Sequence, residues 1–287
     1  MQLRFVLVSV LILAVCSTAF AQPRRIISTA PSITETLFAL GLGDRVVGVT
    51  TYCRYPPEVT RIAKIGTWMQ PNMEAIVALK PDLVILQKTS IQNRGSFDKL
   101  GLRLLEVTFD SVADILTSID QIGRAAGVTP RAQALRKSVE QQLATLHARV
   151  ARTRPTSVLF LVGRTPGTLD AMIAVGPRTY IDEAIGIAGG QNIFGSAAMS
   201  YAKISPEEIL ARNPQVIIDA SHGADSPDMS DAERRAQIAL WQRYSTVAAV
   251  KSGRIFPEAS EVFLVPGPRV VNLVGELVRL LHPEAPR

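Results

Sequence analysis

The stretch TPRAQALRKSVEQQLATLHARVA, from Thr129 to Ala151, decides the architecture of this chain of 287 residues. It contains no glycine, Thr129 supplies an N-cap, Pro130 takes the first helical position, and Arg154-Pro155 follows its end. These features predict one uninterrupted helix, which at 1.5 Å per residue would be roughly 30 Å long. An ordinary crossover helix is shorter, so we expect this helix to link two compact lobes.

Short apolar runs alternate with helical segments on both sides of this helix. The predicted strands are Arg25–Ser28, Val46–Thr50, Leu83–Gln87, Arg103–Val107, Val158–Val162, Val216–Ala220 and Gly253–Pro257. The predicted helices are Ile33–Leu40, Met73–Leu79, Val112–Ala126, Tyr180–Ala188, Glu207–Ala211, Asp231–Trp241 and Pro268–Leu281. Continuous apolar strands that alternate with helices form parallel sheets covered on both faces. We therefore predict an α/β fold of two three-layer lobes with parallel sheets, joined by a single long α-helix.

A pseudo-repeat relates the two predicted lobes. The segment 72–85, NMEAIVALKPDLVI, can be laid on the segment 205–218, SPEEILARNPQVII, with Glu, Ile, Ala and Pro identical in one register. Each copy indicates a capping residue, a short helix, a proline break and a buried strand. Any α/β crossover can resemble this pattern, but these identities in one register, on opposite sides of the long helix, favour duplicated lobes.

The first 21 residues have the pattern of a signal peptide. Arg4 gives a positive start, the run from Phe5 to Val15 is almost wholly apolar, and Ala19-Phe20-Ala21 offers a small-x-small cleavage site. The apolar run is too short for a membrane span, which takes about 20 residues. Lipoprotein anchoring is the alternative, because Leu13-Ala14-Val15-Cys16 approaches a lipobox, although Val15 is branched where such sites hold a small residue.

We therefore predict four segments, namely a signal peptide (1–21), an N-terminal lobe (22–128), a linking helix (129–154) and a C-terminal lobe (155–287). Cleavage after Ala21 would place the mature protein in the periplasm and leave Cys53 as its one cysteine. A lone cysteine cannot form an internal disulfide, and we expect Cys53 to be a small buried side chain. Trp241, on an amphipathic helix, is likewise expected in the core.

The composition is that of a globular protein and narrows the possible partners. Hydrophobic residues make up 47% of the chain and charged residues 20%, close to the average for soluble domains. The formal net charge is +6, but lysines and arginines form no runs. This distribution argues against nucleic-acid binding and permits attraction to anionic ligands.

No residue pattern in the sequence predicts catalysis. The histidines, His147, His222 and His282, form neither an HExxH motif nor a zinc-binding spacing with cysteine. A nucleophile elbow, a P-loop and a strand-linked GxGxxG are all lacking, and Gly41-Leu42-Gly43 follows a predicted helix as its C-cap. We therefore expect no catalytic residue, no metal ligand and no cofactor. An exported α/β enzyme is kept as the alternative of another class.

Aromatic residues in loops favour a binding function instead. Tyr52 follows a predicted strand, Trp68 lies six residues before Glu74, and Tyr201 lies six residues before Glu207. The pseudo-repeat therefore places one large ring on each lobe in equivalent loops. Two rings that face each other across a cleft would hold a large, flat, partly apolar ligand between them.

Motifs spread over nearly the whole mature chain carry a family resemblance. They are RIISTAPSITE (25–35), VGVTTYCRYPPE (47–58), Ile65-Gly66, the segment 74–86, Gly176-Pro177, AGGQN (188–192), the segment 205–218 and Gly267-Pro268-Arg269. With these motifs the chain resembles the helical-backbone (class III) solute-binding proteins of ABC importers. Within that family it is most similar to the cobalamin (vitamin B12)-binding proteins, which share Tyr52, the Tyr-x-x-Tyr-Pro-Pro loop and Thr67-Trp68.

The resemblance implies two Rossmann-like lobes that capture cobalamin or a related corrinoid in the cleft between them. It also implies delivery of this ligand to the permease dimer of an ABC transporter in the inner membrane, and we expect the binding protein itself to be a monomer. The residues that the resemblance and the loop positions nominate for ligand binding are Pro31, Tyr52, Trp68, Arg164, Tyr201, Glu261 and Phe263.

The resemblance further implies that Glu74 and Glu207 pair with arginines of the two permease subunits. Each glutamate lies in the first turn of a predicted short helix, after Asn72 and Ser205 respectively. The helix dipole and the capping geometry favour an acid at that position in any case. Capping alone would explain either residue, but it does not explain why the same position is acidic once in each lobe.

Two departures bear on the identity of the ligand. Tyr201 stands where many cobalamin binders carry a tryptophan, so the stacking surface is smaller. Glu261 takes the acidic position of a late loop, but Val262-Phe263 follows it in place of a tryptophan pair.

Haem and ferric siderophores are the alternative ligands within the family. Haem binders carry an iron-ligating tyrosine where this chain has Trp68, which cannot coordinate iron. Siderophore binders use arginines for anionic ligands, and Arg54, Arg164 and Arg269 lie on candidate cleft loops. Taken singly, each of these arginines is also explained as a surface charge or as a partner of a helix.

Overall fold

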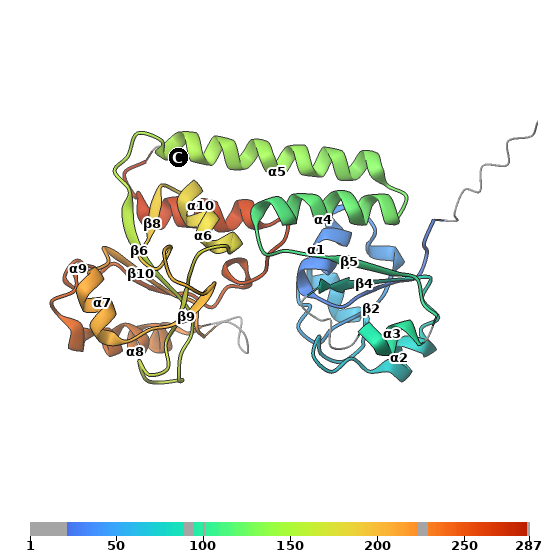
Figure 1. Cartoon of the computed structure of the whole chain (residues 1–287), viewed down its shortest axis with the longest axis horizontal. Coiled ribbons are helices and arrows are strands. Elements are labelled where there is room, and N and C mark those ends of the chain that lie inside the picture. Colours follow the sequence, from blue (N-terminus) through green and yellow to red (C-terminus); the bar gives the residue numbers. More distant parts are fainter. Residues whose placement is uncertain (1–21, 89–93, 100, 223–228, 286–287) are drawn as a thin grey trace, which may run out of the picture.

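The computed structural model describes residues 22–88, 94–99, 101–222 and 229–285, and has the predicted architecture of two lobes bridged by one long helix (Figure 1). The predicted signal peptide lies outside the described residues. The bridging helix is α5, Thr129–Val150. Its N-cap is Val128, so Thr129 lies inside the helix and does not supply the predicted side-chain cap.

The N-terminal lobe holds a five-stranded sheet in the order β3-β2-β1-β4-β5, with neighbouring strands parallel. Its strands are β1 (Ile26–Ser28), β2 (Val46–Val49), β3 (Ala63–Lys64), β4 (Leu83–Gln87) and β5 (Leu104–Val107). Its helices are α1 (Pro31–Ala39), α2 (Met73–Ala78), α3 (Arg94–Asp98) and α4 (Val112–Ala125).

The C-terminal lobe holds a six-stranded sheet in the order β11-β10-β6-β7-β9, with β8 paired to β6. Its strands are β6 (Thr156–Gly163), β7 (Ile173–Val175), β8 (Gly190–Asn192), β9 (Tyr201–Lys203), β10 (Val216–Asp219) and β11 (Ile255–Pro257). Its helices are α6 (Tyr180–Ile187), α7 (Pro206–Arg212), α8 (Asp231–Trp241), α9 (Ala248–Lys251) and α10 (Val270–Leu281).

The second sheet departs from the expected all-parallel arrangement. Strand β7 pairs antiparallel with both β6 and β9. Strands β7 and β9, like β3 and β8, were not predicted, because each has at most three residues and none forms a long apolar run. Tyr201 therefore begins a strand, although it was expected in a loop.

One apolar core runs through both lobes. A single cluster of buried side chains includes Ile33 of the first lobe, Leu143 of α5 and Val158 of the second lobe. Helix α5 packs against α4 along one half of its length and against α10 along the other half (Figure 1). The lobes are therefore continuous parts of one packed structure. Cys53 and Trp241 are both buried, as predicted.

The two halves of the pseudo-repeat have the same conformation. Ile76 in α2 and Ile209 in α7 are both buried under their own lobes. Lys80 and Asn213, each directly before a proline, adopt left-handed φ angles of 45° and 46°. The helix is stopped in the same way in both copies, and an apolar strand follows it in each, β4 in one lobe and β10 in the other.

The contact between α4 and α5 supplies a test of this packing. A Cβ atom on Gly123 would lie 2.2 Å from Cβ of Ala132, whereas one on Gly275 of α10 would meet no described atom within 4 Å. We expect Gly123→Ala to lower the free energy of unfolding by about 1–3 kcal/mol, because the helices must separate. Gly275→Ala should raise it by about 0.5–1 kcal/mol through helix propensity. Urea unfolding measures both, and a stabilised Gly123 variant would contradict this account.

Candidate functional site

A cleft of about 570 Å³ lies between the lobes. The N-terminal lobe contributes the ends of β4 and β5, and the C-terminal lobe contributes the start of α6, the start of β9 and the loop before α10. Its lining residues are Gln87, Phe109, Asp110, Arg178, Thr179, Tyr180, Ser200, Tyr201, Leu264 and Pro266. The cleft therefore lies where parallel strands end, which is the usual ligand site of open α/β sheets.

Tyr180 brings a buried hydroxyl to the wall of this cleft. It is the first residue of α6, which Thr179 caps by accepting a hydrogen bond from the Asp182 N–H. The side chain is 3% exposed, and its hydroxyl has no hydrogen-bond partner among the described residues. Burial raises the pKa of Tyr180 well above its usual value, and electrostatic interaction with the acidic groups of Tyr201 and Glu35 acts in the same direction. The phenol therefore stays protonated and can donate a hydrogen bond.

Tyr201, the first residue of β9, is about half exposed to solvent. Desolvation raises the pKa of its hydroxyl, and the carboxylate of Asp110, from the opposite lobe, raises it further. Of the residues predicted to bind ligand, Tyr201 is the one that lines the 570 Å³ cleft within the described parts of the chain.

A buried ion pair links the two lobes. The Nε atom of Arg269, which precedes α10, donates to Oε2 of Glu35 on α1 at 2.9 Å, and its Nη2 atom donates to Oε1. The side chain of Glu35 is 3% exposed and that of Arg269 is 18% exposed. The guanidinium carbon of Arg269 also stands 3.9 Å from the centre of the Tyr55 ring, a cation–π contact.

The pKa of Glu35 rises above its usual value because burial penalises its charge, although the hydrogen bond and the charge of Arg269 oppose the rise. A second ion pair between the lobes joins Arg54 to Glu261 at 3.6 Å. Burial raises the pKa of Glu261, and Arg54 and Arg269 oppose this rise. The two lobes therefore meet through two acid–arginine pairs.

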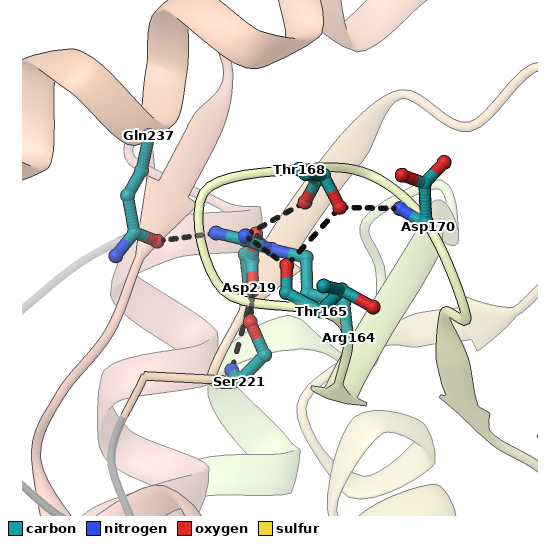
Figure 2. Close-up of polar contacts among 7 residues, drawn as sticks. All are labelled: Arg164, Thr165, Thr168, Asp170, Asp219, Ser221 and Gln237. Carbon is teal, nitrogen blue, oxygen red and sulfur yellow. Dashed lines mark hydrogen bonds and ion pairs between the residues drawn. The ribbon is translucent and has the colours of Figure 1, made fainter.

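Arg164 forms a network of hydrogen bonds inside the C-terminal lobe (Figure 2). Its Nε atom lies 2.9 Å from Oδ2 of Asp219, and both side chains are almost wholly buried. Its other nitrogens donate to Gln237 Oε1 and to the Thr168 carbonyl, both at 2.8 Å. These bonds engage all three guanidinium nitrogens. Arg164 also lines a second pocket, of about 420 Å³, in the C-terminal lobe, and its role in ligand binding stays a prediction. The sequence could not reveal Asp219 as its partner, since 55 residues separate them.

The remaining predicted residues take different positions. Trp68, in the loop after β3, is 41% exposed, while Tyr52 and Pro31, the first residue of α1, are partly buried. Phe263 is 2% exposed and packs with its ring centre 6.2 Å from that of Phe160. Phe263 belongs to the core in this conformation, and its role in ligand binding stays a prediction.

The sequence analysis missed Glu35, Asp110 and Tyr180 as site residues. Glu35 carried a signal, because it is the one acid in the helix PSITETLFA and a lone acid on a buried helix needs a partner. Tyr180 resembles any aromatic residue on the apolar face of a helix. Nothing in the local sequence around Asp110 shows that it faces a second lobe.

Glu74 and Glu207 occupy equivalent places on the surface. Both are exposed and stand two residues after an N-cap whose side chain accepts a backbone hydrogen bond, Asn72 from Ala75 and Ser205 from Glu208. Hydrogen bonds from the Glu207 N–H and from Ser205 lower the pKa of Glu207, so it is ionised at neutral pH.

An exposed apolar side chain follows each glutamate by one turn. Val77 in α2 is 48% exposed and Leu210 in α7 is 42% exposed. Residues three apart lie on the same face of a helix. Each lobe therefore presents an acid beside an apolar side chain at the same place in the pseudo-repeat.

Comparison with known proteins shows where this architecture recurs. The family model described as periplasmic binding protein matches residues 26–258. An uncharacterised ABC transporter substrate-binding lipoprotein of Bacillus subtilis is 29% identical over 92% of this chain and 81% of its own length. The vitamin B12-binding protein of Pectobacterium atrosepticum is 27% identical over 83% of each chain.

Solved structures of periplasmic binding proteins have the same fold. The periplasmic vitamin B12-binding protein of Vibrio cholerae has a TM-score of 0.77 at 24% identity and covers 91% of this chain and 97% of its own. The periplasmic haem-binding protein of Roseiflexus has a TM-score of 0.76 at 26% identity and covers 90% of this chain and 99% of its own. These similarities confirm the predicted fold class and family resemblance.

The ion pair between Arg269 and Glu35 supplies a test of how the lobes are joined. We expect Arg269→Gln to lower the free energy of unfolding by about 3 kcal/mol at pH 7.5, because the variant leaves a buried carboxylate without its partner. The pKa of Glu35 in the folded variant then rises further above its unfolded value. Stability is therefore lost as the pH rises through that raised pKa and is partly recovered at pH 5.

Arg279→Gln is the control for this experiment, since Arg279 pairs with Glu276 on the exposed face of α10, the helix that follows Arg269. Thermal melts at both pH values should show little change for it. A loss of equal size at pH 5 and pH 7.5 in Arg269→Gln would contradict an effect through Glu35.

Proposed function

The chain belongs to the periplasmic binding protein family, and from this premise we propose that it captures cobalamin or a related corrinoid between its lobes. It then delivers this ligand to the permease dimer of an ABC importer. The vitamin B12-binding relatives and the aromatic residues at the cleft support the proposal. In this role the protein performs no reaction and needs no cofactor of its own.

The observation that carries the proposal is the pairing of the three arginines that the sequence nominates for an anionic ligand. Arg54, Arg164 and Arg269 each pair with a carboxylate of this chain. An anionic siderophore would have to compete with those carboxylates for the same guanidinium groups. A large ligand without net charge, such as cyanocobalamin, needs no free arginine, and shape and stacking can hold it.

Trp68 and Tyr201 are the proposed stacking residues. The two side chains are 41% and 47% exposed and belong to different lobes, so each has ring surface to offer to a ligand. Tyr52 and Glu261 complete the proposed ligand set. Each lobe would cover one face of a flat macrocycle.

Haem is the second candidate ligand, because haem-binding proteins of Roseiflexus and Pseudomonas aeruginosa share the fold. An indole cannot ligate iron, so Trp68 could only stack on a porphyrin. Haemin is therefore the competing probe in the binding experiment described below.

We further propose that residues 1–21 direct export to the periplasm and are removed after Ala21. Anchoring at Cys16 is the alternative, and the lipoprotein of Bacillus subtilis among the relatives supports it. No helix within the described parts of the chain is both long and apolar enough to cross a membrane. A monomer with one ligand site would suffice for delivery.

The docking surface is proposed to comprise Glu74 with Val77 and Glu207 with Leu210. Figure 1 places α2 and α7 in different lobes, and α5 runs along another side of the molecule. A pseudo-twofold protein can thus meet a twofold permease with one ion pair and one apolar contact in each lobe. Ion pairs at a rim mainly set orientation and association rate.

Binding of cyanocobalamin tests the proposed ligand. The purified protein, mixed with cyanocobalamin and desalted, should keep the visible absorption of the corrinoid. Trp68→Ala should weaken the affinity about thirtyfold, since truncating a stacking anchor costs about 2 kcal/mol. The melting temperature of the ligand-free variant should hardly change, because Trp68 is not a core residue.

Trp241→Ala is the contrasting variant. Trp241 is wholly buried, so its loss should destabilise the fold by about 3–5 kcal/mol. A similar drop in melting temperature in Trp68→Ala would place Trp68 in the core. Retention of haemin but not of cyanocobalamin would favour the haem alternative.

Reversal of the two surface charges tests docking. Glu74→Arg combined with Glu207→Arg should keep the affinity for cyanocobalamin and abolish its uptake into vesicles that contain the cognate permease and ATPase, because the ion pairs become repulsive. Glu140→Arg with Glu276→Arg is the control, since it reverses two exposed glutamates on α5 and α10. Normal uptake with the first double variant would show that Glu74 and Glu207 only cap their helices.

A further inference from the structure

We infer that the hydroxyl of Tyr180 and the carboxylate of Asp110 form a subsite for an uncharged carboxamide on the rim of the ligand. The inference rests on the proposed function and adds a chemical reason why the protein would bind one class of macrocycle and reject another. Corrinoids carry carboxamides around their rim, whereas haem carries carboxylates. The subsite would therefore separate the two classes by hydrogen bonding.

The first observation is the missing partner of Tyr180. Its hydroxyl is buried beside the cleft and makes no hydrogen bond to any described residue. Buried polar groups are nearly always hydrogen-bonded, because a buried group without a partner has lost its hydrogen bonds to water and gained none in return. A ligand that enters the cleft can supply the missing acceptor. The carbonyl oxygen of a carboxamide is such an acceptor.

The second observation is the acid on the opposite wall. Asp110 follows β5 in the N-terminal lobe, lines the same cleft, and is exposed. Its negative charge raises the pKa of the Tyr201 hydroxyl on the other wall of the cleft. An ionised carboxylate accepts hydrogen bonds and donates none. The NH₂ group of a carboxamide matches it, while a ligand carboxylate would meet it as a like charge.

The charge balance of the cleft agrees with an uncharged ligand group. Among the described lining residues two are charged, Asp110 and Arg178. Arg178 already donates through Nη2 to the carbonyl of Ala198 at 3.0 Å. One positive and one negative side chain leave the wall without net charge, and the phenols of Tyr180 and Tyr201 stay neutral at physiological pH.

The two walls give the subsite its specificity. Tyr180 offers a donor from the C-terminal lobe, and Asp110 offers an acceptor from the N-terminal lobe. A carboxamide presents the complementary acceptor and donor on one small planar group. A group that reaches both walls also holds the lobes together, so recognition and closure depend on the same hydrogen bonds.

Removing the hydroxyl alone tests the Tyr180 half of the subsite. Tyr180→Phe, titrated with cyanocobalamin, should bind three- to tenfold more weakly, the size of one net hydrogen bond. The ligand-free variant should melt at the same or a higher temperature than the natural protein, because a buried unpaired hydroxyl has gone. Tyr244→Phe is the control, since Tyr244 packs against Trp241 away from the cleft, and its affinity should not change.

Changing the ligand tests the Asp110 half. Monocarboxylate derivatives of cyanocobalamin, each with one rim carboxamide hydrolysed, are titrated against the natural protein. At least one derivative should bind tenfold or more weakly, and Asp110→Asn should restore most of that loss because the like charge is removed. The amide of asparagine keeps an acceptor for the parent ligand.

The outcomes separate this inference from the proposed function. If the natural protein retains cyanocobalamin but Tyr180→Phe binds it equally well, the subsite is refuted and the corrinoid carrier stands. Equal affinity of the natural protein for cyanocobalamin and every monocarboxylate refutes the subsite too. If the natural protein retains no cyanocobalamin, the carrier proposal fails and the subsite falls with it.

Discussion

The carboxylate of Glu35 lies buried between the lobes, and the guanidinium of Arg269 is the partner that neutralises it. A buried carboxylate without a partner is costly, so both groups must stay where they meet. The first lobe supplies the acid from α1, and the second supplies the base just before α10. The apolar core around α5 continues on either side of this pair. A large separation of the lobes would break both the ion pair and the apolar core.

The same neutralisation determines the chemistry of the cleft. Arg54, Arg164 and Arg269 pair with acids of the chain. The cleft wall consists of aromatic surface, neutral donors and acceptors, and the oppositely charged Asp110 and Arg178. This surface differs from what the net positive charge of the chain suggests. Charge counted over the whole sequence therefore gives little guidance to the ligand, because the charged residues of the cleft wall balance each other.

The sequence was informative wherever structure is local and periodic. The glycine-free run of α5, the apolar strands such as β4, and the matching caps of α2 and α7 could all be read from neighbouring residues. Short strands such as β8, with the sequence GQN, have no periodic signal and form only because β6 offers an edge to pair with. Contacts between residues that are far apart in the sequence cannot be predicted from local patterns. Glu35 and Arg269, for example, are 234 residues apart.

That separation has a consequence for how the chain reaches its native state. Synthesis and any passage of the chain through a membrane proceed from the N-terminus, so Glu35 is present long before Arg269 follows it. Until then the acid of α1 must stay hydrated or take up a proton. The ion pair between the lobes can therefore form only after the segment just before the last helix has been made.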